Sequence, residues 1–271
     1  MEQLARQSDR LIRYIGVTGH HGPAAARNAG WKTAHGKIIA FTDDDCLPQP
    51  EWLQEGLAVL DLQNADAAWG KLSMPLPPEP TDYERDAAGL ASAVFVTANC
   101  FCRRKAIEQV GGFDERFTAA WREDSDLYFS LLKHQFKVIP APRAHVVHPI
   151  RPAPWGISLW QQRKSQFDAL LYRKHPEYYR QYIAAFPRDY YLISAALVLM
   201  LFGVLSRSWL TVVLAVAIWL IFTARFCQRR LAGTSKAPRH LREMLVTSVL
   251  IPPLSLYWRL RGAIRFRTLF F

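Results

Sequence analysis

The sequence predicts an α/β fold, in which helices flank a mixed sheet, followed by a C-terminal helical hairpin that crosses a membrane. A short apolar run at 38–41 is followed by Thr42 and then by consecutive acidic residues, which is typical of a buried strand in an open α/β sheet. A strand pattern, a helix start and a glycine turn follow one another across 98–117. Nearly uninterrupted apolar sequence then covers 190–226, which is long enough for two membrane crossings.

The first acidic cluster consists of three consecutive carboxylates, Asp43, Asp44 and Asp45. A strand delivers the residues that follow it to the carboxyl edge of the sheet, where open α/β folds bind their ligands. Adjacent carboxylates repel one another unless a cation joins them, and such oxygen ligands suit Mg²⁺ or Mn²⁺ that also binds substrate phosphates. An acidic turn that caps the next helix is the alternative, and the cluster alone does not decide between the two.

A second acidic cluster, Glu123, Asp124 and Asp126, opens a predicted helix with Leu127 and Leu131 on its apolar face. Carboxylates at a helix N-terminus are favoured by the helix dipole, so capping is the simplest role for them. We assign that role to Asp126. The presence of a second cluster favours a ligand site over two unrelated turns.

Four short motifs follow one another along the chain: Ala-Arg-Asn-Ala-Gly at 26–30, Phe-Thr-Asp-Asp-Asp at 41–45, Gly-Gly-Phe-Asp-Glu at 111–115 and Glu-Asp at 123–124. In this order they resemble the family 2 glycosyltransferases of the GT-A fold across roughly residues 10–185. Each motif is weak alone, and the order and spacing make the signal specific. The resemblance implies a Rossmann-like mixed sheet and transfer of a sugar from a nucleotide diphosphate donor to an acceptor hydroxyl, with inversion at the anomeric carbon.

The resemblance also implies donor and metal sites. Asp43 and Asp45 match the outer acids of the family's Asp-x-Asp motif, so Asp43 would contact the donor and Asp45, helped by Asp43, would hold Mg²⁺ or Mn²⁺. Asp44 lies between them and is assigned to the donor site. Arg27 matches a position near the donor diphosphate, and a solvated surface arginine is the alternative. His148 follows a strand-like segment where some relatives place a third metal ligand, and packing beside the next proline is the alternative.

Sugar transfer explains why acids are needed in two places. Breaking the bond to a diphosphate loads negative charge onto the leaving oxygen, which a bound cation stabilises. The attack comes from the opposite face of the sugar, where a second carboxylate accepts the acceptor's proton. The matching family position favours Asp124 as this base, with Glu123 as the alternative. Trp121 and Phe113 are candidates for stacking on the acceptor, and ordinary core or turn aromatics are the alternative.

The N-terminal part of the family pattern is not found in this sequence. Relatives normally begin with a strand, a helix and a second strand that ends in paired acids, whereas residues 1–15 resemble the helix and strand that follow. We therefore expect a GT-A-like domain at 1–186 that is incomplete at its N-terminus. A noncatalytic membrane-anchored remnant of a glycosyltransferase is the alternative function. A phosphatase with an Asp nucleophile is disfavoured, because Cys46 and Leu47 follow Asp45 where such enzymes need a Thr or Val.

Charge and hydropathy set the C-terminal part of the chain apart. The net charge is −3 over 1–150 and +14 over 151–271, which together make the total of +11. We expect a membrane region at 187–271, and a buried soluble helical pair is the alternative. Its predicted elements are transmembrane helices at about 190–206 and 209–226 and a short membrane-associated segment at 245–258, which contains two prolines.

Cations on both flanks of the hairpin predict its topology. Arg188 precedes the hairpin, Arg207 lies in the connecting turn, and several arginines follow from Arg225 onwards. Both flanks are therefore expected on the cytoplasmic side of an inner (cytoplasmic) membrane, together with the catalytic domain, where nucleotide sugars are made. The basic C-terminal tail alternates cations with apolar residues, which indicates membrane lipid rather than nucleic acid as its partner.

The acceptor is predicted from a sequence signature and from the membrane attachment. Processive relatives carry a Gln-x-x-Arg-Trp signature, whereas this chain reads Trp-Gln-Gln-Arg-Lys at 160–164, which argues against polymer synthesis. The membrane attachment favours a lipid-linked acceptor or another envelope glycan. The four cysteines have no paired zinc spacing and indicate no disulfide framework.

Overall fold

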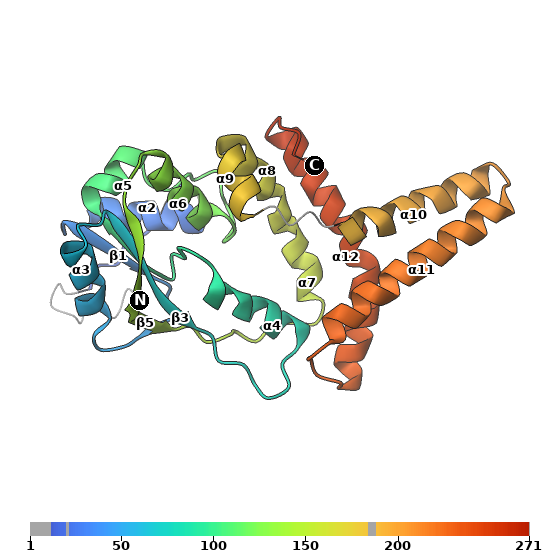
Figure 1. Cartoon of the computed structure of the whole chain (residues 1–271), viewed down its shortest axis with the longest axis horizontal. Helices are drawn as coiled ribbons and strands as arrows, with labels where there is room; N and C mark the ends of the chain where they lie inside the picture. Colours follow the sequence, from blue (N-terminus) through green and yellow to red (C-terminus); the bar gives the residue numbers. More distant parts are fainter. Residues whose placement is uncertain (1–11, 20–21, 184–187, 271) are drawn as a thin grey trace. The chain divides into compact units, whose positions relative to one another are not determined.

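The computed structural model describes residues 12–19, 22–183 and 188–270. A five-stranded sheet with the order β1-β4-β3-β5-β2 is flanked by helices (Figure 1). β4 is antiparallel to β1 and β3, and β2 is antiparallel to β5. β3 and β5 are parallel, because Asp66 N donates to Lys137 O and His148 N donates to Ser73 O, which confirms the predicted mixed α/β sheet. The strands are β1 (Ile38–Thr42), β2 (Leu47–Pro48), β3 (Ala67–Ser73), β4 (Asn99–Arg103) and β5 (Val138–Val147).

Two compact units make up the chain. Unit 1 contains Met1–Asp43, Pro50–Gly70 and Phe95–Ala144. Unit 2 contains Asp44–Gln49, Lys71–Val94 and His145–Phe271. The first acidic cluster is therefore divided, since Asp43 belongs to unit 1 whereas Asp44 and Asp45 belong to unit 2.

The strands of unit 1 are joined by backbone pairing and by one buried amide side chain. β1 and β4 pair with Ile39 opposite Cys102. Asn99, fully buried at the start of β4, accepts a hydrogen bond from Trp52 Nε1 at 2.8 Å and donates to Ala144 O at 2.9 Å. A buried amide needs such partners, so Asn99 fixes the position of β4 relative to its neighbours.

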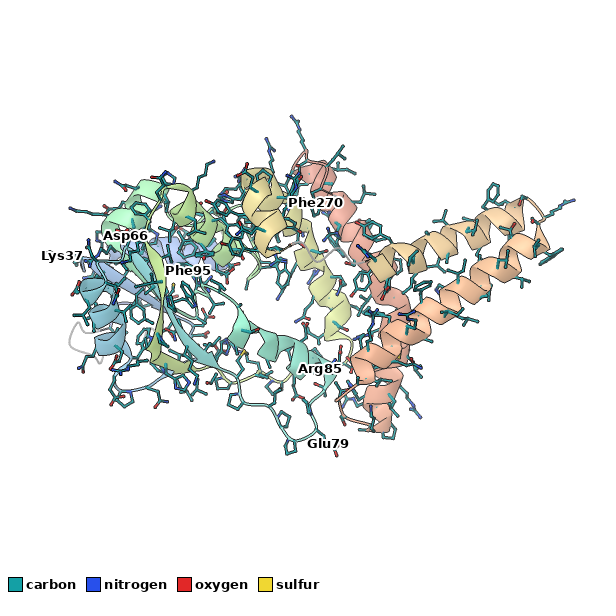
Figure 2. The ribbon with its side chains drawn as sticks, viewed as in Figure 1. Lys37, Asp66, Glu79, Arg85, Phe95 and Phe270 are labelled. Atoms are coloured by element: carbon teal, nitrogen blue, oxygen red, sulfur yellow. The ribbon has the colours of Figure 1, made fainter. Side chains whose placement is uncertain are left out.

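Within the described residues, four helices of unit 1 cover its apolar core. One of them approaches β4 closely, because a Cβ at Gly56 would lie 2.3 Å from the fully buried ring of Phe101. Figure 2 shows Phe95 in the interior of the same unit, where its ring stacks on Tyr128 with centroids 5.4 Å apart. The helices are α2 (Pro23–Thr33), α3 (Trp52–Leu62), α5 (Arg104–Val110) and α6 (Glu123–Lys133).

A glycine turn after α5 is held in place by a hydrogen bond to a side chain of α2. Phe113 N donates to Asn28 Oδ1 at 2.9 Å, and Trp31 Nε1 donates to the same oxygen at 2.9 Å. Gly112 has φ of 75°, and a Cβ there would lie 2.7 Å from that oxygen, so the turn requires glycine for two reasons. The hydrogen bonds of Asn28 fix α2 beside the turn and thereby orient the neighbouring Arg27.

Among the described residues, two helices of unit 2 are long and apolar enough to cross a membrane. They are Arg188–Leu205 and Trp209–Leu231, and only 17% and 22% of an apolar 18-residue stretch in each is buried. Figure 1 shows them as an antiparallel hairpin, and they match the predicted hairpin positions. The helices of unit 2 are α4 (Asp82–Ala88), α7 (Ile157–Gln161), α8 (Gln166–Lys174), α9 (Pro176–Tyr182), α10 (Arg188–Leu205), α11 (Trp209–Leu231) and α12 (Pro238–Arg265), with short 3₁₀ turns η1 (Gly89–Ser92) and η2 (Gln162–Ser165).

The segment at 245–258, predicted to be membrane-associated, lies within α12, which runs for 28 residues through Pro252 and Pro253. Proline inside a helix removes a hydrogen bond and crowds the preceding turn. One face of α12 is nevertheless buried at Met244, Ser248 and Ile251, and it packs against α8, α10 and α11. This tertiary packing outweighs the local cost of the prolines.

Residues 157–174 form α7, η2 and α8 in succession. The helix and strand expected at 1–15 fall mostly outside the described residues, and 12–15 form no strand. Residues 75–80 have no regular secondary structure, which agrees with their several prolines.

Candidate functional site

The first group of site residues, which we call the Arg27 cluster, comprises Arg27, Asp43 and Glu123 in unit 1. α2 supplies the arginine, the end of β1 supplies Asp43, and the first turn of α6 supplies Glu123. Arg27 Nη2 donates to Asp43 Oδ1 at 2.9 Å, and Arg27 Nη1 donates to Glu123 Oε1 at 2.8 Å. Burial alone would lower the pKa of Arg27, but the two carboxylates outweigh it and raise the pKa. The guanidinium is therefore a fixed cation that links the two acidic motifs.

Glu123 and Asp124 are both shifted toward their protonated forms. Burial, reinforced by the charge of Asp124, raises the pKa of Glu123 to about 7. Burial also raises the pKa of Asp124, against the opposing hydrogen bond from Ser125 N to Asp124 Oδ1 at 2.7 Å. Among the described residues, Glu123 Oε2 is buried and has no hydrogen-bond partner. A carboxylate with a raised pKa is well suited to accept a proton near neutral pH.

The substitution Glu123→Gln is expected to flatten the pH dependence of stability between about pH 4.5 and 7. Because the pKa of Glu123 is raised from 4.5 to about 7, the folded chain binds more protons than the unfolded chain in this window. Stability therefore falls as the pH rises through it, by at most about 3 kcal/mol. Denaturant unfolding at a series of pH values measures the slope. The control Glu108→Gln removes a half-exposed acid and should keep the original slope, whereas an unchanged slope in Glu123→Gln would contradict the prediction.

The second group, which we call the Asp45 cluster, comprises Asp45, Cys46 and His148 in unit 2. β2 pairs with the end of β5, with Leu47 opposite Val147, and this pairing brings the end of the acidic run beside His148. One ligand atom from each of the three side chains lies within 4.8 Å of the others. Asp45 Oδ1 and His148 Nε2 are 3.7 Å apart.

The donor set of the Asp45 cluster fits a divalent metal. Two ligands at about 2.1 Å from one ion lie at most about 4.2 Å apart, and the carboxylate and imidazole satisfy this limit. Carboxylate and imidazole are both common ligands of first-row divalent metals, whereas the thiol of Cys46 is a softer donor. The residues present can therefore hold a divalent ion with Asp45 and His148 as principal ligands.

Arg151 binds the acids of unit 2 and was not recognised in the sequence. Its Nη2 donates to Asp44 Oδ1 at 2.8 Å, and its Nε donates to Asp45 Oδ2 at 2.5 Å. The sequence pointed to this contact only through the position of Arg151, a basic residue three positions after His148 in a segment without helix or strand periodicity. Cys46 was likewise not considered as a ligand, although it directly follows Asp45.

The structure groups some predicted site residues and separates others. Asp43 lies with Arg27, and Asp45 lies with His148, as described above. Phe113 is only 3% exposed and packs edge to face against Phe41, with centroids 5.4 Å apart. Trp121 is 38% exposed, and the guanidinium of Arg122 lies 4.5 Å from its ring centroid. Asp126, assigned to capping, is buried in the first turn of α6.

Comparison with known proteins identifies relatives across most of the chain. The family model described as glycosyl transferase family 2 matches residues 1–111. The model described as glycosyl transferase family group 2 matches residues 83–222. Glycosyltransferase AglE of Haloferax volcanii is 32% identical over 101 residues, which cover 34% of this chain and 33% of AglE. The pre-mycofactocin glycosyltransferase of Mycobacterium tuberculosis is 29% identical over 182 residues, which cover 58% of this chain and 37% of that enzyme.

The fold also matches a solved structure. The mannosyltransferase PcManGT from Pyrobaculum calidifontis, in complex with GDP-Man and Mn²⁺, aligns with a TM-score of 0.55 and 17% identity, covering 94% of this chain and 73% of that protein. At this identity the likeness shows a shared GT-A-like fold. The matched regions span only about a third of the length of the curated relatives. Because one family model covers more than half of the sequence, the chain belongs to glycosyl transferase family group 2.

Proposed function

We propose that this protein is an inverting glycosyltransferase, which transfers a sugar from a nucleotide diphosphate donor to an acceptor hydroxyl with the help of a divalent cation. The observation that carries the proposal is the 3.7 Å separation of Asp45 Oδ1 and His148 Nε2, in a cluster that begins two residues after Asp43. Because Asp43 and Asp45 are only two positions apart, their Cα atoms lie within about 7 Å of each other in any conformation. The complex of PcManGT with GDP-Man and Mn²⁺ supports a donor of this class.

The donor side of the reaction is assigned to the acidic run and to Arg27. Asp45 and His148 would hold the cation, with Asp43 as a further oxygen ligand, and imidazole ligation favours Mn²⁺ over Mg²⁺. When bound, the cation neutralises charge that develops on the diphosphate leaving group. Asp43 and Asp44 would contact the donor. Arg27 holds Asp43 in place at 2.9 Å and adds positive charge near the diphosphate.

The acceptor side is assigned to the start of α6. Asp124 would accept the proton of the attacking hydroxyl, since burial raises its pKa toward the working range of a general base. Glu123 is the alternative base, but Arg27 already binds one of its oxygens at 2.8 Å. Trp121 remains our candidate for contact with the acceptor. Phe113 would contribute indirectly, because its ring lies 5.9 Å below the guanidinium of Arg27.

The membrane assignment rests on α10 and α11, which have mean hydropathies of 1.6 and 2.2. We propose that residues 1–186 form the GT-A-like domain and 187–271 the membrane region, with both flanks of the hairpin in the cytoplasm. Arginines at the C-terminal end of α11 support this orientation. A lipid-linked acceptor or an envelope glycan at an inner membrane agrees with such an attachment.

The proposal is tested by incubating the full chain, in detergent or nanodiscs, with nucleotide diphosphate sugars and either Mn²⁺ or Mg²⁺. We expect release of nucleoside diphosphate that depends on the metal. With an α-linked donor, proton NMR of the transfer product should show a β-linkage. A product of retained configuration would contradict the inverting mechanism. Absence of turnover with every donor, in a folded sample, would favour the noncatalytic alternative.

A further inference from the structure

An open cationic cavity of about 360 Å³ lies within unit 2 and is lined by residues of neither acidic cluster. It is formed between α4, the segment before α7, α7 itself and η2. Its lining combines two aromatic side chains with three cations, and no carboxylate contributes to it. The aromatic and cationic residues are Tyr83, Trp160, Arg151, Arg163 and Lys164.

The cations of this cavity differ in how far their surroundings offset their charge. Arg151 is shared with Asp44 and Asp45, which places one wall of the cavity next to the Asp45 cluster. In the described part of the chain, neither Arg163 nor Lys164 forms an ion pair, although the charge of Lys164 opposes the rise that burial causes in the pKa of Asp86 in α4. The Arg163 guanidinium lies 4.8 Å from the ring centroid of Trp160, which orients it without neutralising it. Two unpaired cations and an arginine in one concavity favour a phosphate, which accepts charge-assisted hydrogen bonds from both residue types.

The walls of the cavity are anchored to the apolar helices. Arg230, near the C-terminal end of α11, is 6% exposed and donates through Nη2 to Asp82 of α4 at 2.8 Å. Arg230 Nη1 also donates to Thr247 Oγ1 of α12 at 2.6 Å. Gly156 N, just before α7, donates to Glu243 Oε1 of α12 at 2.7 Å. Breaking a buried ion pair of this kind is costly, so the cavity keeps its place beside the end of α11.

Arg85 adds a second connection between α4 and α11. Its Nη2 donates to Arg229 O at 3.2 Å, at the end of α11 where backbone carbonyls lack partners within the helix. Figure 2 labels Arg85, which lies in α4. A ligand in the cavity would therefore lie at the level where a candidate membrane span ends, which favours a phosphate carried by a lipid over one dissolved in water.

We propose that this cavity binds the phosphate group of a lipid-borne acceptor, with Arg163 and Lys164 as the principal contacts and Tyr83 and Trp160 beside the adjoining apolar chain. The inference rests on the proposed function, because it assigns the acceptor side of that same reaction. Arg151 would connect the two sites, since it contacts the Asp45 cluster and also lines the cavity.

The test measures binding of a labelled polyprenyl monophosphate to the full chain in nanodiscs of zwitterionic lipid, without a sugar donor. The double variant Arg163→Gln/Lys164→Gln is expected to bind at least about tenfold more weakly, because two charge-assisted contacts are lost. The matched control Arg239→Gln/Arg242→Gln removes two exposed cations of α12 that do not line the cavity and should bind within about twofold of the native chain. Polyprenol without a phosphate is expected to compete poorly.

Three outcomes would overturn the inference. Equal losses of binding in both double variants would indicate nonspecific attraction of the anionic lipid. Competition by polyprenol as strong as that by the phosphorylated lipid would show that the phosphate is not recognised. Displacement by inorganic phosphate at the same concentration as the lipid would indicate a soluble ligand. Binding is measured without sugar transfer, so a chain that binds the lipid and transfers no sugar refutes the proposed function and leaves this site intact.

Discussion

Replacing Asp124 with asparagine is expected to lower the rate of sugar transfer by about a thousandfold or more. A general base contributes about 10² to 10⁴ to a rate, and an amide cannot accept the proton of the attacking hydroxyl. The loss should appear mainly in kcat, because the proton is transferred in the chemical step rather than during binding. Initial rates of transfer to the acceptor, monitored through the release of nucleoside diphosphate, give both kcat and KM.

The Asp124→Asn variant should fold as the native chain does. Burial already raises the pKa of Asp124, so the site tolerates a neutral group of the same shape, and Oδ1 can still accept from Ser125 N. Glu123→Gln is the informative comparison, because one of its oxygens is bound by Arg27. We expect Glu123→Gln to lose less activity than Asp124→Asn. A larger loss of activity in Glu123→Gln than in Asp124→Asn would indicate that Glu123, and not Asp124, is the general base.

The sequence was sufficient to predict those parts of the fold that depend on local patterns. The apolar run before Asp43 became β1, and the acidic start at Glu123 became α6 with the expected buried face. The apolar hairpin was also located to within a few residues, except that α11 continues to Leu231. Each of these elements follows from the length or periodicity of its own apolar pattern, which depends only on residues within that element.

What the sequence left open depends on contacts between distant segments. Arg27 binds Glu123 across 96 positions, and Arg151 binds Asp45 across 106, so no local pattern reveals either pair. The burial that raises the pKa of Glu123 is a property of the packed unit. The continuity of α12 through two prolines likewise depends on the helices that cover it.

Replacing Asp45 with asparagine is expected to weaken Mn²⁺ binding about tenfold or more and to lower sugar transfer about a hundredfold. The substitution removes the only carboxylate of the Asp45 cluster, and a neutral amide oxygen binds a divalent ion more weakly than a carboxylate does. The remaining imidazole of His148, 3.7 Å away in the native chain, cannot neutralise the charge of the ion. Electron paramagnetic resonance of free aqueous Mn²⁺ measures the binding without any need for turnover.

Asp61→Asn provides the matched control for this experiment, since it removes an exposed carboxylate that pairs with Arg103. Its Mn²⁺ affinity and transfer rate should stay within about twofold of the native values, because exposed ion pairs contribute little. If Asp45→Asn bound Mn²⁺ as tightly as the control, the cluster would not be the metal site. If Asp45→Asn lost Mn²⁺ affinity while keeping full activity, the ion would be structural and not catalytic. Arg27 would then be the principal positive charge near the departing diphosphate.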